Sequence, residues 1–404
     1  MAKTAAAQQL KQAQPDPAPA EPGPAVAQIA TSLANTGISE DIIAMGAYLL
    51  HENCRSVVIS GGGAQTEAVL ETGSEHFDLP FEATYGFFAA VRMGFRLSQT
   101  LSASKVDVVH LHSQNLVWPV YIACRLSGKA LVVHVQDPLG SVKQAPLSVL
   151  KKTPLTTPTQ TKKQQLVELG VPDALITVTP PGYSSQHFTP AQTDADKVDA
   201  LWSEWDVPTA TRVIYAPTRQ LEETAGLETF ITALGPLRQM PFKAIISGDY
   251  SHNHDQFTAL WQQVEATGLS DHVLFVGSPH HEAATYGATD VVVCPHRYAA
   301  PVSRALLKAQ AMGKPVIATD LSDHREIIEH DESGWLFPVD DHRKLTELLK
   351  KALADNIRLH KMGGHGAKII PQQHSYKTRL PDVFRLYQEL AGNSGKPQQQ
   401  IKSN

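Results

Sequence analysis

The segment SRALLKAQAM combines residue types that could bind an anion. Ser303 is a good N-cap for a helix that runs through this segment, and Gly313 is placed to end that helix. The backbone N–H groups near Arg304, Ala305 and Leu306 would then be free, and the helix dipole favours a negatively charged group beside them. A diphosphate would fit such a site. The competing interpretation is an ordinary turn between a strand and a helix, since short motifs often occur without a ligand.

A second candidate is the glycine-rich stretch SGGGAQTEAV at residues 60–69, which follows an apolar run. It lacks both the full dinucleotide-binding fingerprint and a following Gly-Lys-Ser/Thr, so we interpret it as a structural turn.

The 18 histidines raise the question of a metal site. His280 and His281 are adjacent and cannot easily share one ion, and His252 and His254 lie in a polar segment. Cys294 and His296 would face the same side of a strand end, but no four-ligand set with a familiar spacing emerges. The sequence therefore predicts no metal site.

The elements that would position these residues alternate along the chain as short β-branched runs and helical stretches, a pattern typical of parallel sheets covered by helices. The strands expected in the first half are residues 25–30, 56–60, 106–112, 130–136 and, more weakly, 174–180. Those expected in the second half are residues 212–217, 243–249, 272–277, 290–295 and 315–320. We therefore predict an α/β protein with two Rossmann-like halves.

A cluster of Pro, Gly, Ser and Thr near residue 190 marks the boundary between the halves. The predicted organisation is a disordered leader over 1–23, an N-terminal domain over 24–189, a C-terminal domain over 190–375, a helix over 376–392 and a disordered tail over 393–404. The last helix has an apolar face that must be buried, and Pro381 predicts a kink or a fresh helix start.

Composition excludes several classes of protein. Among 404 residues there are 35 basic and 40 acidic side chains without blocks of one sign, so we expect no nucleic-acid partner. No run approaches the length of a membrane-spanning helix, and the leader does not read as a secretory signal. Cys54, Cys124 and Cys294 each lie in or beside an apolar run, which indicates buried, reduced thiols and a cytoplasmic setting.

Several segments, in order and spacing, resemble the retaining glycosyltransferases of family 4, which have the GT-B fold. They include VDVVHLHSQ, YAPTRQLEETAGLETFITAL, IISGDY, SRALLKAQAMGKPVIATD, EII and SGWLFPVDD, and the resemblance covers roughly residues 25–392. It implies two Rossmann-like domains that face each other across a cleft. The C-terminal domain would hold a nucleotide-sugar donor and the N-terminal domain a glycan or lipid-linked acceptor, with no metal or other cofactor.

On the donor side the resemblance is uneven. Arg219 matches the family arginine that contacts the donor diphosphate, whereas the lysine expected a few residues later is replaced by Ala225 and Gly226. The paired glutamates of the family fall on Ala300 and Lys308. We hypothesise that Lys308 points at phosphate instead, one turn beyond Arg304. The resemblance assigns to the donor site Arg219, Gly248, Gly277, Ser303, Arg304, Ala305, Leu306, Lys308 and Glu326.

On the acceptor side, the resemblance assigns Gly37, His134 and Gln136. The family commonly has a second glycine where Ile38 stands and a histidine where Gln136 stands. His134 lies two residues earlier on the same strand and could substitute in part, and a core histidine is the alternative interpretation.

Three hypotheses follow. The first is a retaining glycosyltransferase of surface polysaccharide or glycolipid synthesis, cytoplasmic or peripheral to the inner membrane, for which no catalytic residue is assigned. The second is a catalytically impaired relative that binds a sugar nucleotide, a glycan or a partner glycosyltransferase, as the replacements at Ala300, Lys308, Ala225 and Gln136 suggest. The third, other chemistry on the same fold, has no positive motif.

Overall fold

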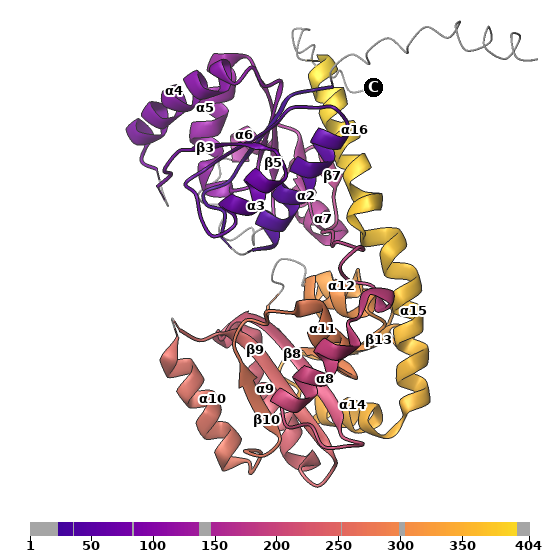
Figure 1. Ribbon diagram of the computed structural model, residues 1–404. Coiled ribbons are helices and arrows are strands. Elements are labelled where there is room, and N and C mark those ends of the chain that lie inside the picture. The colour runs from indigo at the N-terminus through magenta and orange to yellow at the C-terminus, as the bar shows by residue number, and fades with distance from the viewer. Residues whose placement is uncertain are drawn as a thin grey trace, which may run out of the picture.

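The structure is a computed structural model that describes residues 23–34, 36–82, 85–136, 147–251, 253–298 and 304–393. Nearly all of the expected leader, almost the whole tail, and the site positions Ala300 and Ser303 lie outside these described residues. Figure 1 shows two lobes, one above the other, joined along one side by the last two helices.

The first lobe contains a parallel seven-stranded sheet in the order β3-β2-β1-β4-β5-β6-β7. Its strands are β1 (Val26–Ile29), β2 (Ser56–Ser60), β3 (Glu75–Asp78), β4 (Val108–Leu111), β5 (Ala130–His134), β6 (Leu155–Thr157) and β7 (Ile176–Val178). All five strands expected in this half are present. The sequence did not predict β3, an edge strand of the polar sequence EHFD, or β6, which has only three residues.

The second lobe contains a parallel six-stranded sheet in the order β10-β9-β8-β11-β12-β13. Its strands are β8 (Arg212–Gln220), β9 (Phe242–Asp249), β10 (Val273–Val276), β11 (Val291–Cys294), β12 (Val316–Thr319) and β13 (Gly334–Phe337). Only β13 was not expected from the sequence. Central strands such as β11 and β12 are wholly buried and mostly apolar because helices cover both faces of each sheet.

The helices are distributed between the lobes in chain order. The first lobe has α2 (Gly37–His51), α3 (Thr66–Glu71), α4 (Phe87–Ala103), α5 (Val117–Ser127), α6 (Leu147–Leu150) and α7 (Gln160–Glu168). The second has α8 (Ala195–Glu204), α9 (Leu227–Leu234), α10 (His254–Ala266), α11 (Glu282–Gly287), α12 (Arg304–Ala311), α13 (Ser322–Arg325), α14 (His342–Ala354) and α15 (Asn356–His374). Within the described part of the chain, no helix is long and apolar enough to cross a membrane.

The chain returns to the first lobe through its last helix, α16 (Tyr376–Asn393). In Figure 1, α15 runs beside the lower lobe and α16 continues along the upper one. The apolar face of α16 packs in a cluster with Met45 and Leu49 of α2, with Tyr387 fully buried. The fresh helix start lies at Ser375, whose hydroxyl accepts from the N–H of Thr378, and Pro381 is inside the helix instead of beginning it.

The two sheets present their carboxyl ends to each other. Helix α2 begins after β1 and helix α12 begins after β11, and their first turns are in direct contact across the lobe boundary. In open α/β sheets, ligands bind at the carboxyl ends of the strands. The architecture therefore places both expected half-sites at one interdomain boundary.

Candidate functional site

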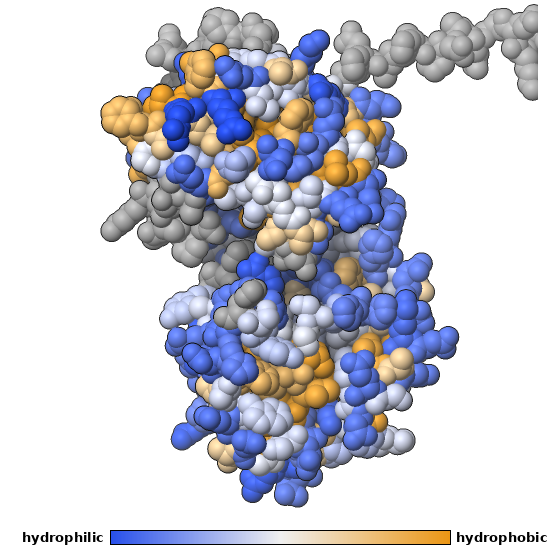
Figure 2. Space-filling model, turned by 60° about the vertical axis from the view of Figure 1, so that its left-hand side comes forward, coloured by the Kyte–Doolittle hydropathy of each residue, from blue (hydrophilic) through white to orange (hydrophobic). Residues whose placement is uncertain are grey.

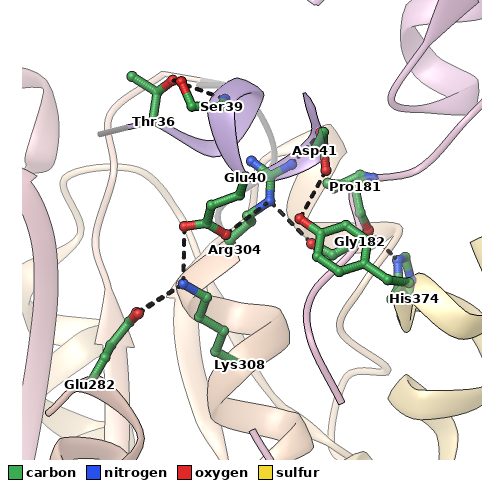
Figure 3. A network of polar contacts seen from close by, with 11 residues as sticks. Thr36, Ser39, Glu40, Asp41, Pro181, Gly182, Glu282, Arg304, Lys308 and His374 are labelled. Carbon is green, nitrogen blue, oxygen red and sulfur yellow. Dashed lines mark hydrogen bonds and ion pairs between the residues drawn. The ribbon is translucent and has the colours of Figure 1, made fainter. Parts of the chain in front are cut away.

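The site is built on the first turns of α2 and α12. Thr36 caps α2, since its hydroxyl accepts from the N–H of Ser39 at 3.4 Å, and the acidic residues Glu40 and Asp41 follow at once. Figure 3 shows these carboxylates pointing toward the two cations of α12, Arg304 and Lys308. The expected cap at Ser303 lies outside the described residues.

Arg304 connects three parts of the chain. Its guanidinium pairs with Asp41, donates from Nε to the carbonyl oxygen of Gly182 at 3.1 Å, and lies 3.9 Å from a carboxylate oxygen of Glu40. Burial by itself would lower the pKa of Arg304, but the negative charges of Asp41 and Glu40 raise it above its ordinary value. Arg304 is therefore a permanent cation held between the lobes.

Lys308 lies one turn further along α12 and is bound by carboxylates. Its ammonium donates to Glu282 of α11 at 2.9 Å and to Glu40 at 3.3 Å, and it lies 4.7 Å from the ring centre of Phe188. The side chain is only 7% exposed. Glu40 and Glu282 already neutralise the charge of Lys308. A phosphate at Lys308, as hypothesised from the sequence, would have to compete with these two carboxylates.

Gly37, the first residue of α2, lies against Arg304. A Cβ atom built on Gly37 would overlap the guanidinium. Its φ is not in the left-handed region, so the glycine is required by close approach and not by backbone conformation. The expected acceptor-side glycine thus makes room for a side chain of the other lobe.

Tyr376 extends this network to the last helix. Its hydroxyl donates to Asp41 at 3.1 Å, and burial, followed by the charge of Asp41, raises the pKa of Tyr376 far above its ordinary value. Asp41 therefore accepts from both Arg304 and Tyr376. We call Gly37, Glu40, Asp41, Glu282, Arg304, Lys308 and Tyr376 the interdomain clamp.

Glu326, which the sequence resemblance assigns to the donor site, binds the start of α7. Its two carboxylate oxygens accept from the backbone N–H groups of Gln160 and Thr161 at 2.8 and 2.9 Å, and also from the Thr161 hydroxyl. A carboxylate is favourable there because the first N–H groups of a helix lack partners and carry positive dipole charge. Glu326 is a second link between the lobes, supplied by the C-terminal lobe.

Arg219 differs from Arg304, Lys308 and Glu326, whose side chains all have partners. It lies near the carboxyl end of β8, where the register with β9 shifts between Pro217 and Gln220, and such a bulge re-aims side chains. Arg219 is exposed, and its guanidinium makes no ion pair or hydrogen bond to any of the described residues. It is therefore a free cation at the sheet edge that faces the other lobe.

The two expected donor-side glycines follow the same edge. A Cβ on Gly248, at the end of β9, would overlap the hydroxyl of Thr218, beside Arg219. Gly277, which follows β10, is exposed and faces open space. Of the expected α12 residues, Leu306 is buried in the core and Ala305 is partly buried against it.

The turn that lacks the expected lysine contains a different cation. Gly226 has a φ of 67°, and a Cβ there would overlap the carbonyl oxygen of Pro295, so the position is closed to larger residues. Arg297 reaches this turn from the loop after β11 and pairs with Asp340 at 2.9 Å and with Glu228 at 3.4 Å. No local pattern indicates Arg297, because its partners are distant in the chain.

His134 belongs to a buried histidine cluster. Its Nδ1 lies 3.0 Å from the Thr156 hydroxyl, and its ring lies 6.3 Å from that of His110 and 6.1 Å from that of His112. Burial lowers the pKa of His134 to about 4, the charge of Arg304 acts in the same direction, and a hydrogen bond with Gln136 opposes both. His134 is therefore neutral, as a core histidine would be.

A small cavity of about 60 Å³ joins this cluster to the clamp, since its lining includes His112, His134, Asp41 and Tyr376. The Nε2 atom of His112 is buried there without a hydrogen-bond partner among the residues that the structure describes. No group of three or more His, Cys, Asp and Glu side chains in the described ranges is arranged to hold a metal ion, and His252 lies outside them.

Sequence reasoning missed Glu40, Asp41, Glu282, Arg297 and Tyr376. The acidic pair Glu40 and Asp41, three and four residues after Gly37, was a usable signal, because carboxylates at a helix start favour a nearby cation. For Glu282 and Tyr376 the sequence contained no comparable signal.

Two facing Rossmann-like lobes, with cations and helix starts gathered at their shared boundary, define a protein of the GT-B fold. The family model "Glycosyltransferase Family 4" matches residues 35–187, and the model "Glycosyl transferases group 1" matches residues 209–369. The chain therefore belongs to the group 1, or family 4, glycosyltransferases, as the sequence resemblance predicted.

Characterised relatives match parts of the chain. The phosphatidyl-myo-inositol mannosyltransferase of Mycobacterium leprae (strain TN) is 26% identical over 136 residues, which is 33% of this chain and 36% of that protein. The lipopolysaccharide core biosynthesis mannosyltransferase LpsB of Rhizobium meliloti (strain 1021) is 27% identical over 171 residues, which is 41% of this chain and 48% of LpsB. The matched regions thus span less than half the length of these two relatives.

Solved structures share the whole fold. A glycosyltransferase from Rickettsia africae ESF-5 superposes with a TM-score of 0.84 at 19% identity, over 92% of this chain and 99% of that one. Anabaena HepE in complex with UDP and glucose superposes with a TM-score of 0.78 at 18% identity, over 90% and 99%. At such identities the likeness establishes the GT-B fold, which confirms the predicted fold class.

Proposed function

We propose that this protein transfers a sugar, with retention of anomeric configuration, from a nucleoside diphosphate donor to a glycan or lipid-linked acceptor in surface polysaccharide or glycolipid synthesis. The observation that carries the proposal is Arg219: an exposed guanidinium at the carboxyl edge of the C-terminal sheet that has no partner among the described residues. A guanidinium suits a diphosphate because it donates two parallel hydrogen bonds. The UDP and glucose bound to HepE support a donor of this class.

The clamp provides a second cation for the same diphosphate. Arg304 stands at the start of α12, and a phosphate oxygen can replace the carboxylate of Asp41 as its acceptor. In this proposal the donor diphosphate contacts Arg219 and the N–H groups at the start of α12, and Arg304 exchanges Asp41 for phosphate. These positive groups stabilise the leaving diphosphate electrostatically, so the proposed reaction needs no metal ion.

A specific observation favours a second candidate, a sugar-nucleotide-binding or partner-binding module without transfer activity. Lys308 stands where the family has a carboxylate and is bound by Glu40 and Glu282, so its ammonium offers no acceptor to a ribose hydroxyl. With Ala300 at the other position, the paired glutamates of the family are absent. The two candidates differ in turnover and share the donor site.

The first test is calorimetric binding of UDP, GDP and ADP to the wild type and to Arg219→Ala. We expect one nucleotide to bind and the substitution to weaken it by about tenfold to a hundredfold, as for the loss of charge-assisted hydrogen bonds. Arg238→Ala is the matched control, because Arg238 is exposed and precedes β9 at the opposite edge of the same sheet. Equal affinity of Arg219→Ala and wild type would refute the proposed donor site.

The second test separates the two candidates. The protein is incubated with the sugar conjugate of the nucleotide that binds, with and without a membrane extract as acceptor source, and release of the nucleoside diphosphate is followed. The transferase proposal expects release that depends on the extract and is lost in Arg219→Ala. Tight binding without any release would favour the binding module.

A further inference from the structure

One face of the N-terminal lobe exposes large aromatic side chains at the start of α4. Phe87, Phe88 and Phe95 are 73%, 86% and 59% exposed, and Phe87 and Phe88 meet edge to face with ring centres 5.6 Å apart. Trp118 and Leu126 of α5 are exposed as well. Figure 2 shows hydrophobic colour gathered on the lobe built by α4 and α5, with strongly hydrophilic side chains among it.

These aromatic residues do not serve the core. The buried face of α4 consists of smaller residues, including Ala90, Gly94 and Leu97, and a Cβ on Gly94 would overlap Ile122 of α5. Phe88, Val91 and Phe95 recur at helical spacing on the outward face instead. Helix α4 thus has apolar residues on two faces, and the lobe buries only the inner one. An exposed apolar face of this kind is typical of an interaction surface.

The charge of this region is strongly positive. Between residues 83 and 136 there are five basic residues and one acidic residue, although the whole chain has a net charge of −5. That single acid, Asp107, accepts from the backbone N–H of Ala25 and so belongs to the sheet. The exposed arginines Arg92 and Arg96 lie one turn apart on α4, next to the aromatic residues.

A groove of about 390 Å³ runs beside these arginines. Its lining combines Arg92 and Arg96 with the apolar side chains of Phe81, Tyr85 and Met93, and also includes Glu82. Two guanidinium groups within an apolar groove suit a phosphate group that is attached to an apolar body.

We propose that the outward face of α4 docks on the surface of an anionic phospholipid bilayer. Phe87, Phe88 and Phe95 enter the interface between headgroups and acyl chains, and Arg92 and Arg96 bind lipid phosphates. The charge of the region favours an anionic bilayer, because α4 carries two exposed arginines and no carboxylate, and Glu82 is the one acidic residue in the lining of the groove. The proposal suits a lipid-linked acceptor but does not depend on the transfer reaction.

The test is flotation of the full-length protein with vesicles of phosphatidylcholine, with and without about one-third phosphatidylglycerol, at low salt. We expect binding to the anionic vesicles. Arg92→Glu/Arg96→Glu should weaken that binding by about thirtyfold or more, as for the loss of two cations at an anionic surface. Phe87→Ser/Phe88→Ser should weaken it by about tenfold or more, through loss of inserted apolar surface.

The matched controls are Lys350→Glu/Lys361→Glu, with the same change of charge on exposed residues of α14 and α15, and Ile357→Ser, at a residue 84% exposed on α15. Both should bind vesicles like the wild type. The proposal is overturned if the wild type does not float, if the control variants lose as much binding, or if the aromatic variant loses a dimer in solution while vesicle binding is unchanged. Nucleotide binding, measured on the same variants, reports on the donor site separately.

Discussion

The guanidinium of Arg304 lies directly over Gly37, so the first turn of α12 closes on the first turn of α2. This contact joins the two lobes at the position where the fold places its ligand. A side chain of the protein, paired with Asp41, thus occupies the approach to the start of α2. In the donor complex that we propose, Arg304 would couple diphosphate binding to the contact between the two lobes.

The first prediction concerns Arg304→Ala. The substitution leaves Asp41 without its cation, whereas Glu40 keeps Lys308, so we expect the free energy of unfolding to fall by about 2 kcal/mol. The estimate is below the cost for a fully buried pair because Asp41 is 35% exposed. Solution X-ray scattering should show a larger radius of gyration, as the lobes separate. Scattering identical to that of the wild type would contradict the inference that Arg304 holds the two lobes together.

The second prediction is a double-mutant cycle between Gly37 and Arg304. Gly37→Ala should destabilise the protein, because the new methyl group displaces the guanidinium. In the Arg304→Ala background the same change should be neutral or slightly stabilising, because alanine is the better helix former. Urea unfolding of the four proteins measures the coupling. Additive effects would mean that the two residues do not meet in solution.

The third prediction concerns Glu326, which binds the start of α7 from the other lobe. Glu326→Ala should lower the free energy of unfolding by about 1 kcal/mol, the usual cost of losing a helix cap. Amide hydrogen exchange at Gln160 and Thr161 should accelerate. Glu332→Ala is the control, since Glu332 is exposed and its side chain binds nothing else in the described part of the chain. Unchanged exchange at α7 would contradict the contact.

The fourth prediction concerns pH. Burial is the main reason that the pKa of His112 is lowered from an ordinary value of 6.5 to about 3, and protonation of the neighbouring His134 would lower it further. Between these values the unfolded chain binds a proton that the folded protein excludes, so the free energy of unfolding falls as pH drops below 6.5. From pH 7.5 to pH 5, His112 should account for about 2 kcal/mol of this loss.

Urea unfolding of His112→Gln at these two pH values tests the prediction. The variant should lose about 2 kcal/mol less than the wild type on acidification. The control His280→Gln, at an exposed histidine, should behave like the wild type. An equal loss in His112→Gln and wild type would show that His112 titrates normally in the folded protein.

Much of the fold could be predicted from the sequence, because each strand is a local run of β-branched residues followed by a helical pattern. The runs at residues 56–60 and 291–294 illustrate this, since both are wholly buried and rich in valine, with isoleucine also in the first. The strands β3 and β6 could not be predicted. Their sequences EHFD and LTT pair with β2 and β5 only because of where the sheet places them.

The sequence by itself determined the family, the two-lobed α/β architecture and the identity of Arg219 and the α12 segment as candidates for binding an anion. These features depend on local patterns and on the order of motifs along the chain. Only the tertiary structure decided which of the candidates are free. Arg304 and Asp41 are 263 residues apart, and Lys308 and Glu40 are 268 apart, so their pairing has no local signal. It arises because two helix starts, each at the carboxyl end of a parallel strand, meet where the two sheets face each other.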